Sequence, residues 1–150
     1  MKKKAKTILR TIIILSISTI IWLGCNFAPG SYPYAEHYEL NVNEDTLIKE
    51  IQNFKKENPQ YNVPKQAQLE DGRDKNGGYW YFFYFYYQKE NQVILTWTRS
   101  ESKTKTIFAF VGVGEGLTLS NWKEVNKDFS KSDNNLQKQK FEERILKYVQ

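Results

Sequence analysis

Residues 79–99 read YWYFFYFYY-QKEN-QVILTWTR, and this stretch decides the fold. Nine consecutive aromatic residues are followed by four polar residues and then by a run of β-branched, aliphatic and aromatic side chains. Because such side chains favour strands, the pattern predicts two antiparallel strands joined by a turn at 88–91. A strand presents alternate side chains to opposite faces, so both faces of the first strand are aromatic.

The second of these strands distinguishes the two faces of the predicted sheet. The side that carries Val93, Leu95 and Trp97 is apolar, whereas the Thr side is amphipathic. We therefore expect helices to cover the apolar side. Two interpretations of the other side stay open: it is a Tyr/Trp/Thr-rich surface, or residues 59–78 bury it. The candidate binding residues of such a surface are Trp80, Tyr84, Tyr86, Thr96 and Thr98.

Two further strands are expected downstream. Residues 105–113 (KTIFAFVGV) form a third strand, and residues 117–119 add a short fourth strand. The glycines of residues 112–116 lie between them. A phosphate-binding loop would need a helix N-terminus after these glycines, so we interpret them as a hairpin turn or a bulge. Residues 121–132 are expected to be irregular.

A helix is expected on each side of these strands. Asn43 can cap a helix that begins with two acidic residues and ends at Asn58-Pro59. Asp133 is expected to cap a closing helix. The residues expected to be buried are Leu47, Ile48, Ile51 and Phe54 in the first helix and Leu136, Phe141, Ile145, Leu146 and Val149 in the second.

The segments around the first helix complete the predicted order. Residues 37–42 alternate between apolar and polar side chains and form a strand. Residues 59–78 are expected to hold a short edge element, at 61–63 or 67–69, followed by a turn at 71–78. Helices at both ends of an antiparallel sheet define an α+β fold. We predict a two-layer sandwich with a meander of three to five strands, in a single domain over residues 37–150.

The N-terminus indicates where the protein is located. A basic segment, an uncharged apolar run at residues 11–23 and a terminal Gly24-Cys25 are typical of a secretory signal. The apolar run is shorter than the ~20 residues that a membrane-spanning helix needs. Cys25 stands where a lipoprotein signal carries its acylated cysteine, directly after Gly24. We predict a signal peptide at residues 1–24, lipidation of Cys25, and a tether over residues 25–36.

Composition excludes several classes of function. The chain has 22 basic and 17 acidic residues, but five of the basic residues lie before Cys25, so the remainder is formally neutral. A nucleic-acid-binding domain would need its basic excess on the folded part. One Cys and one His, His37, predict no metal site and no nucleophilic relay. We expect no cofactor and no enzyme; the alternative is a pocket around Glu70, Asp71 and Arg73.

Two sequence blocks carry a resemblance to a known family. Residues 116–128 (GLTLSNWKEVNKD) and 140–146 (KFEERIL), together with the lipoprotein signal, resemble small lipoproteins of Bacteroidota-type bacteria. The resemblance carries over no catalytic residue. It implies a host with two membranes and a protein that is tethered to the outer membrane and faces the periplasm. Residues 26–29 lack the acidic residues that direct such lipoproteins to the cell surface.

We base the expected function on the predicted lipid anchor, the high aromatic content and the absence of a recognisable group of catalytic residues in the sequence. We expect a membrane-anchored envelope lipoprotein whose domain binds another envelope protein through a sheet face or a strand edge. A secretion-system accessory and an immunity lipoprotein are both open within this class. The alternative outside this class is glycan or small-ligand binding on the aromatic face, since Tyr and Trp combine large contact area with a polar group.

Overall fold

The computed structural model describes residues 32–73 and 78–150. In these residues an antiparallel sheet of six strands is combined with helices, which confirms the α+β class. The sheet has one strand more than the predicted maximum. Its strands are β1 (Glu36–Leu40), β2 (Gly72–Arg73), β3 (Tyr81–Tyr87), β4 (Gln92–Ser102), β5 (Lys105–Glu115) and β6 (Ser120–Glu124). The helices are α2 (Glu44–Glu57) and α3 (Lys131–Arg144), with short 3₁₀ turns η1 (Pro59–Tyr61), η2 (Lys65–Ala67) and η3 (Leu146–Tyr148).

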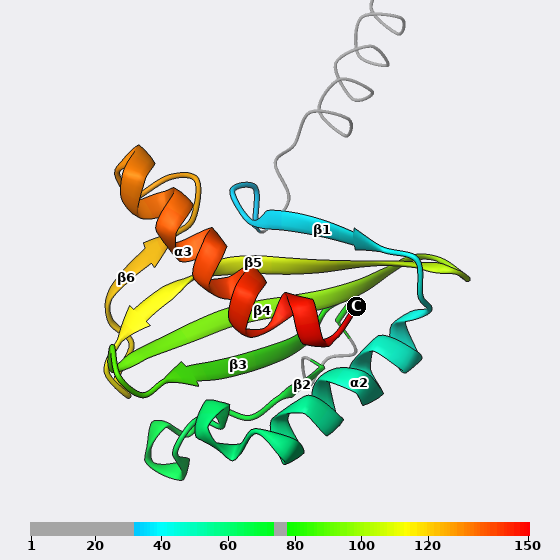
Figure 1. Ribbon diagram of the computed structural model, residues 1–150, viewed down its shortest axis with the longest axis horizontal. Helices are drawn as coiled ribbons and strands as arrows, with labels where there is room; N and C mark the ends of the chain where they lie inside the picture. The colour runs from blue at the N-terminus through cyan, green and yellow to red at the C-terminus, as the bar shows by residue number, and fades with distance from the viewer. Residues whose placement is uncertain (1–31, 74–77) are drawn as a thin grey trace, which may run out of the picture. The chain divides into compact units, whose positions relative to one another are not determined.

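Strands β3, β4 and β5 follow the predicted meander, and β2 and β6 extend it at its two ends. The order across the sheet is β1-β5-β4-β3-β2, and β6 pairs with β5 beyond the end of β1. In the central hairpin Phe83 lies opposite Thr96, and a bulge follows where the β4–β5 register shifts between Leu95 and Thr96. Figure 1 shows α3 crossing the sheet and α2 lying beside its β3 edge. The predicted boundary at residue 24 falls outside the described residues.

The core lies between the two helices and one face of the sheet, which we call the inner face. Phe83, Phe85, Phe108 and Phe110 point inward from the strands and are fully buried. Phe141 of α3 stacks on Phe110 with ring centroids 5.0 Å apart. Several predicted helix residues are buried here as expected: Leu47, Ile48, Ile51, Phe54, Ile145, Leu146 and Val149.

The first helix begins and ends as predicted. The Asn43 side chain accepts a hydrogen bond from the Thr46 backbone N–H at 2.9 Å, and the acidic residues of the first turn face the positive end of the helix dipole. Asn58 ends the helix.

The closing helix differs from the prediction in three respects. It ends at Arg144, so Ile145, Leu146 and Val149 follow the helix, in and around η3. Ser130, not Asp133, is its cap, because the Ser130 hydroxyl accepts a hydrogen bond from the Asp133 N–H at 3.2 Å. Asp133 instead lies in the first turn. Leu136 is 48 % exposed rather than buried. The earlier start of α3 leaves Gln137 and Phe141, one turn apart, as its buried residues.

Two short elements lie elsewhere than predicted. The edge element after α2 is β2, which falls inside the segment interpreted as a turn and pairs Gly72 with Phe82. The fourth hairpin strand is β6, which begins after residues 117–119. Gly116 and Leu119 have φ values of 64° and 55°, so this segment turns instead of extending. The strand therefore starts at Ser120 and continues into residues 121–124, which were expected to be irregular.

Candidate functional site: the outer aromatic face and the closed sheet edge

The face of the sheet opposite to the core is covered by aromatic rings. We define the outer aromatic face as the outward side chains Trp80, Phe82, Tyr84, Tyr86, Leu95 and Trp97, which share one side because Phe82 lies opposite Trp97 and Tyr84 opposite Leu95. The Trp80 and Trp97 rings lie 6.2 Å apart and the Trp80 and Phe82 rings 6.5 Å apart. No helix among the described residues packs on this face.

Contacts between neighbouring side chains fix the rings of this face. His37 of β1 meets the Trp97 ring edge-on, with centroids 5.3 Å apart, and the Arg99 guanidinium lies 5.8 Å from the same ring. Trp97 is only 2 % exposed, whereas Phe82, Tyr84 and Leu95 are partly buried. The rings of this face therefore form a layer in contact with one another and with side chains of the neighbouring strands.

The structure separates the predicted binding residues into two groups. Trp80, Tyr84 and Tyr86 lie together on the outer aromatic face. Tyr86 is further held by a hydrogen bond from its hydroxyl to Asn91 Oδ1, at 2.8 Å. Thr96 and Thr98 lie on the inner face and are fully buried. Their assignment to an open surface is therefore wrong.

Volume and hydrogen bonding explain why the threonines point inward. The large inward rings of Phe83, Phe108 and Phe110 leave space for small side chains between them. Each Thr hydroxyl finds an acceptor: Thr96 donates to the Phe83 carbonyl at 3.0 Å, and Thr98 donates to Glu44 Oε1 at 3.2 Å. A buried hydroxyl that is hydrogen-bonded carries little penalty. The apolar side of β4 consequently faces outward, the reverse of the prediction.

The connection after α2 was the other candidate to cover the outer aromatic face, but its first turn, η1, packs on the opposite side of the sheet. Tyr61 of η1 stacks on Phe54 of α2 at 5.4 Å and meets the ring of Tyr87 at 6.1 Å. Both partners belong to the core, so this part of the connection extends the helix layer. Tyr61 therefore does not take part in the alternative interpretation, in which residues 59–78 bury the outer side of the sheet.

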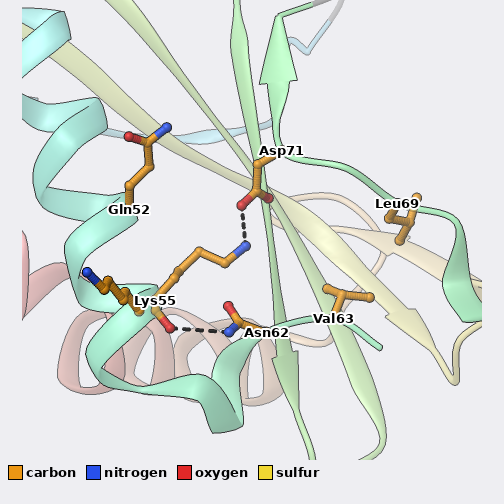
Figure 2. Close-up of a pocket in the computed structure, with 7 residues that line it drawn as sticks. Gln52, Lys55, Asn62, Val63, Leu69 and Asp71 are labelled. Atoms are coloured by element: carbon orange, nitrogen blue, oxygen red, sulfur yellow. Dashed lines mark hydrogen bonds and ion pairs between the residues drawn. The ribbon is translucent and has the colours of Figure 1, made fainter. Parts of the chain in front are cut away.

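Two charged side chains close the edge of β3 next to the first residue of β2. Figure 2 shows Lys55 reaching from α2 to Asp71, with which it forms an ion pair. The Lys55 ammonium also donates to the Tyr84 carbonyl at 2.8 Å, and the Tyr84 N–H donates to Asp71 Oδ1 at 2.9 Å. These contacts satisfy backbone groups that a neighbouring strand would otherwise pair. An unpaired edge is a template for pairing with another chain, so the pair blocks one site of strand addition.

Two of the three polar residues considered for an enzyme pocket, Asp71 and Arg73, hold this same edge to α2. Asp71 binds Lys55, and Arg73 forms an ion pair with Glu44 of α2 at 2.8 Å. Glu70 is exposed. An open depression of about 320 Å³ lies beside the Lys55–Asp71 pair. It is lined by Gln52, Lys55, Lys56, Asn62, Val63, Leu69 and Asp71.

A second ionic cluster joins the β3–β4 turn to the end of α3. Arg144 donates to Glu90 Oε1 at 2.9 Å, and this hydrogen bond lowers the pKa of Glu90 and raises that of Arg144. The guanidinium lies 4.7 Å from the ring of Tyr87, whose pKa is raised by burial. A cavity of about 340 Å³ opens beside this cluster. Arg144 and Lys140 share Glu90 as their counter-ion, and Lys89 also lines the cavity.

Lys55 is the site residue that sequence reasoning missed. It follows Ile48 and Ile51 at helical spacing and so lies on the buried side of α2, where a lysine needs a partner. The position of Lys55 on the apolar side of the predicted helix could therefore have indicated a buried ion pair. The partner Asp71 was read as part of a turn because its distance in sequence gives no sign of the contact.

Comparison with known proteins returns no matching family model, no similar curated protein and no similar solved structure. Among the described residues no three His, Cys, Asp or Glu side chains are grouped so that they could hold a metal ion. The same residues contain no helix with the length and hydrophobicity needed to span a bilayer. Gly24 and Cys25, the predicted cleavage and lipidation positions, lie outside the described residues.

Proposed function

We propose that this protein is a lipid-anchored envelope protein whose α+β domain binds another envelope protein without catalysing a reaction. The observation that carries the proposal is the outer aromatic face, on which no described helix packs. Outward aromatic and aliphatic side chains from two paired strands form this apolar surface. Aromatic side chains supply much contact area at low conformational cost and are enriched at protein interfaces.

The ionic contacts of the domain support a binding role over catalysis. Asp71, Arg73 and Glu90 each pair with a side chain of a helix, in contacts that join the sheet to α2 or α3. These groups therefore contribute to the fold. The outer aromatic face, in contrast, has the apolar and aromatic composition that is typical of a protein interface.

The anchor is supported by the arrangement of the first 25 residues. A basic segment, a short apolar run and the sole cysteine of the chain occur in the order of a lipoprotein signal. A diacylglyceryl group with an added acyl chain exceeds the two-signal threshold for stable membrane anchoring. We propose the outer membrane as the location and the periplasm as the side that the domain faces.

Metabolic labelling tests the anchor. Cells that express the full chain are grown with an alkyne analogue of palmitate, and the label on the protein is compared with that on the Cys25→Ser variant. We expect label on the wild type and none on the variant. Absence of label from both proteins would refute the lipid anchor.

Site-specific photocross-linking tests the partner surface. p-Benzoylphenylalanine replaces Tyr84 on the outer aromatic face or, as a matched control, Tyr148, which is 63 % exposed beside the helices. Irradiation of intact cells should give a discrete cross-linked protein from position 84 and none from position 148. Equal products from both positions, or none from position 84, would exclude this face as the interface.

A further inference from the structure

The block 116–128 carries a motif with no known chemistry. One of its residues, Asn126, contacts the start of the folded domain. Asn126 Nδ2 donates to the carbonyl of Tyr34 at 3.0 Å and to Glu36 Oε2 at 2.8 Å. The same side chain accepts a hydrogen bond from Asn134 of α3 at 2.8 Å through its Oδ1 atom. Asn126 thus joins the beginning of β1 to α3. The point at which the predicted tether leaves the domain is therefore fixed.

The same block places exposed aromatic and basic side chains around this point. Because β1 and β6 pair with adjacent stretches of one edge of β5, with Glu36 opposite Phe110 and Glu124 opposite Gly112, the end of β6 adjoins the start of β1. We define the tether-exit patch as Tyr34, Trp122 and Lys127. Lys127 lies 5.2 Å from the ring of Tyr34.

Trp122 is held in place although it is exposed. Its ring lies on Gly112, where an added Cβ would come within 2.7 Å of Trp122 Cζ2. The absence of a side chain at Gly112 allows the ring to lie against β5. Even so, Trp122 is 37 % exposed, and Tyr34 is 44 % exposed. The fold thus orients two aromatic rings at the tether exit and leaves much of each in contact with solvent.

The length of the tether limits what this patch can meet. Nine peptide units separate Cys25 from Tyr34. At 3.3–3.6 Å per residue they span at most about 30 Å, comparable to the thickness of the hydrocarbon layer itself. If Cys25 is acylated, the tether exit stays within this distance of the anchored cysteine and therefore close to the bilayer surface.

The chemistry of the patch matches a phospholipid interface. Trp and Tyr are enriched where lipid headgroups meet hydrocarbon, and Lys can extend its amine towards the headgroups. Lys127 is paired with Glu124 at 2.6 Å, so the patch has little net charge. We therefore do not expect electrostatic attraction to anionic lipid to contribute much to binding. The aromatic rings supply the affinity for the interface instead.

We propose that the tether-exit patch contacts the surface of the phospholipid bilayer in which Cys25 is anchored, with Trp122 inserted at the headgroup level. The proposal rests on the lipid anchor of the proposed function. It assigns the block 116–128 the role of setting the orientation of the domain. The outer aromatic face is then presented to a partner in a defined direction relative to the membrane.

The lone cysteine permits a test that does not depend on natural acylation. Residues 25–150 are coupled through the Cys25 thiol to a maleimide-headgroup lipid in phosphatidylcholine vesicles whose acyl chains are brominated near the headgroup. Among the described residues the core begins at Tyr38, so this fragment keeps all of its described members. Bromine quenches tryptophan fluorescence only at short range. The fragment contains Trp80, Trp97 and Trp122.

We expect part of the emission to be quenched in the wild type and in Trp80→Phe, and this quenching to disappear in Trp122→Phe. Circular dichroism checks that each variant is folded. Equal quenching in Trp122→Phe and the wild type would overturn the proposal, as would absence of quenching in every protein. Palmitate labelling that fails while quenching persists would refute natural lipidation and leave the membrane-contacting patch intact.

Discussion

Lys55 and Asp71 act at Tyr84 in place of a neighbouring strand. The lysine donates to the Tyr84 carbonyl, and the aspartate accepts from its N–H, so both backbone groups of an edge residue are satisfied by side chains. Their side chains are 11 % and 25 % exposed. A charged pair that is mostly buried depends on both partners, because the group that remains after loss of one is left without its counter-charge.

Lys55→Met should therefore destabilise the domain. Methionine keeps the aliphatic contacts of the lysine but removes the donor to Asp71 and to the Tyr84 carbonyl. We expect a loss of about 1–3 kcal/mol in the free energy of unfolding, measured by urea denaturation. Lys56→Met is the matched control, since Lys56 is exposed on the same helix, and it should change stability little. Equal effects of the two substitutions would show that the edge contact contributes nothing.

At the scale of elements, β4 faces two different layers. Ile94 points to the inner face and is fully buried against the helices, whereas its neighbour Leu95 points to the outer aromatic face and is partly buried. The helix layer contributes contacts to one of them and not to the other. These adjacent residues therefore report on the two faces separately.

Ile94→Ala should cost about 2–5 kcal/mol, because it removes a methyl-rich side chain from a closely packed core. Leu95→Ala removes as many carbon atoms but leaves a smaller unfilled space on a face without a described helix. We expect a distinctly smaller loss for Leu95→Ala in the same urea titration. Equal losses would mean that the outer aromatic face is packed as tightly as the core.

The ionic contact between Arg144 and Glu90 joins the β3–β4 turn to α3 and should depend on pH. The hydrogen bond from Arg144 lowers the pKa of Glu90 in the folded state. The contribution to stability is then fully present above the pKa of the unfolded state, and it is lost as the pH falls through the folded pKa. The two side chains are 32 % and 24 % exposed, so solvent weakens the interaction.

Glu90→Gln should consequently lower stability at neutral pH by up to about 1 kcal/mol. In acid, where the wild-type carboxyl is protonated, the difference between variant and wild type should disappear. Urea midpoints of both proteins across this pH range provide the measurement. A difference that is independent of pH would show that the glutamine acts through packing and not through loss of charge.

At the scale of the whole molecule, the core is complete within the domain. All residues of the hydrophobic cluster and those packed against it lie between Tyr38 and Val149. Residues 32–37, the described part of the chain before Tyr38, contribute none of them. In the proposed function the predicted tether connects the domain to the membrane.

Residues 32–150 should therefore unfold at the same urea concentration as residues 25–150. Both fragments keep the contacts of Asn126 with the start of β1, so loss of the tether alone should leave the transition unchanged. Intrinsic fluorescence monitors both transitions. A lower midpoint for the shorter fragment would show that the tether packs on the domain and stabilises it.

Local patterns in the sequence were sufficient for much of the fold. Asn43 and the spacing of Leu47, Ile51 and Phe54 predicted α2, because capping and helical periodicity depend on neighbouring residues. The aromatic run followed by QKEN and a β-branched run likewise predicted the β3–β4 hairpin. The basic head, apolar run and Gly24-Cys25 predicted a lipoprotein signal, which labelling has yet to test.

The tertiary structure alone decided which face of the sheet lies inside. A strand that is aromatic on both sides has no polar face to mark the exterior, so the sequence favoured the apolar side of β4 as the core. The packed structure buries Thr96 and Thr98 instead, because the Phe rings of neighbouring strands fill the inner space and each hydroxyl finds an acceptor. Volume and hydrogen bonding between segments distant in sequence set this outcome. For the same reason the Lys55–Asp71 contact and the contacts of Asn126 with the start of β1 emerge only in the folded domain.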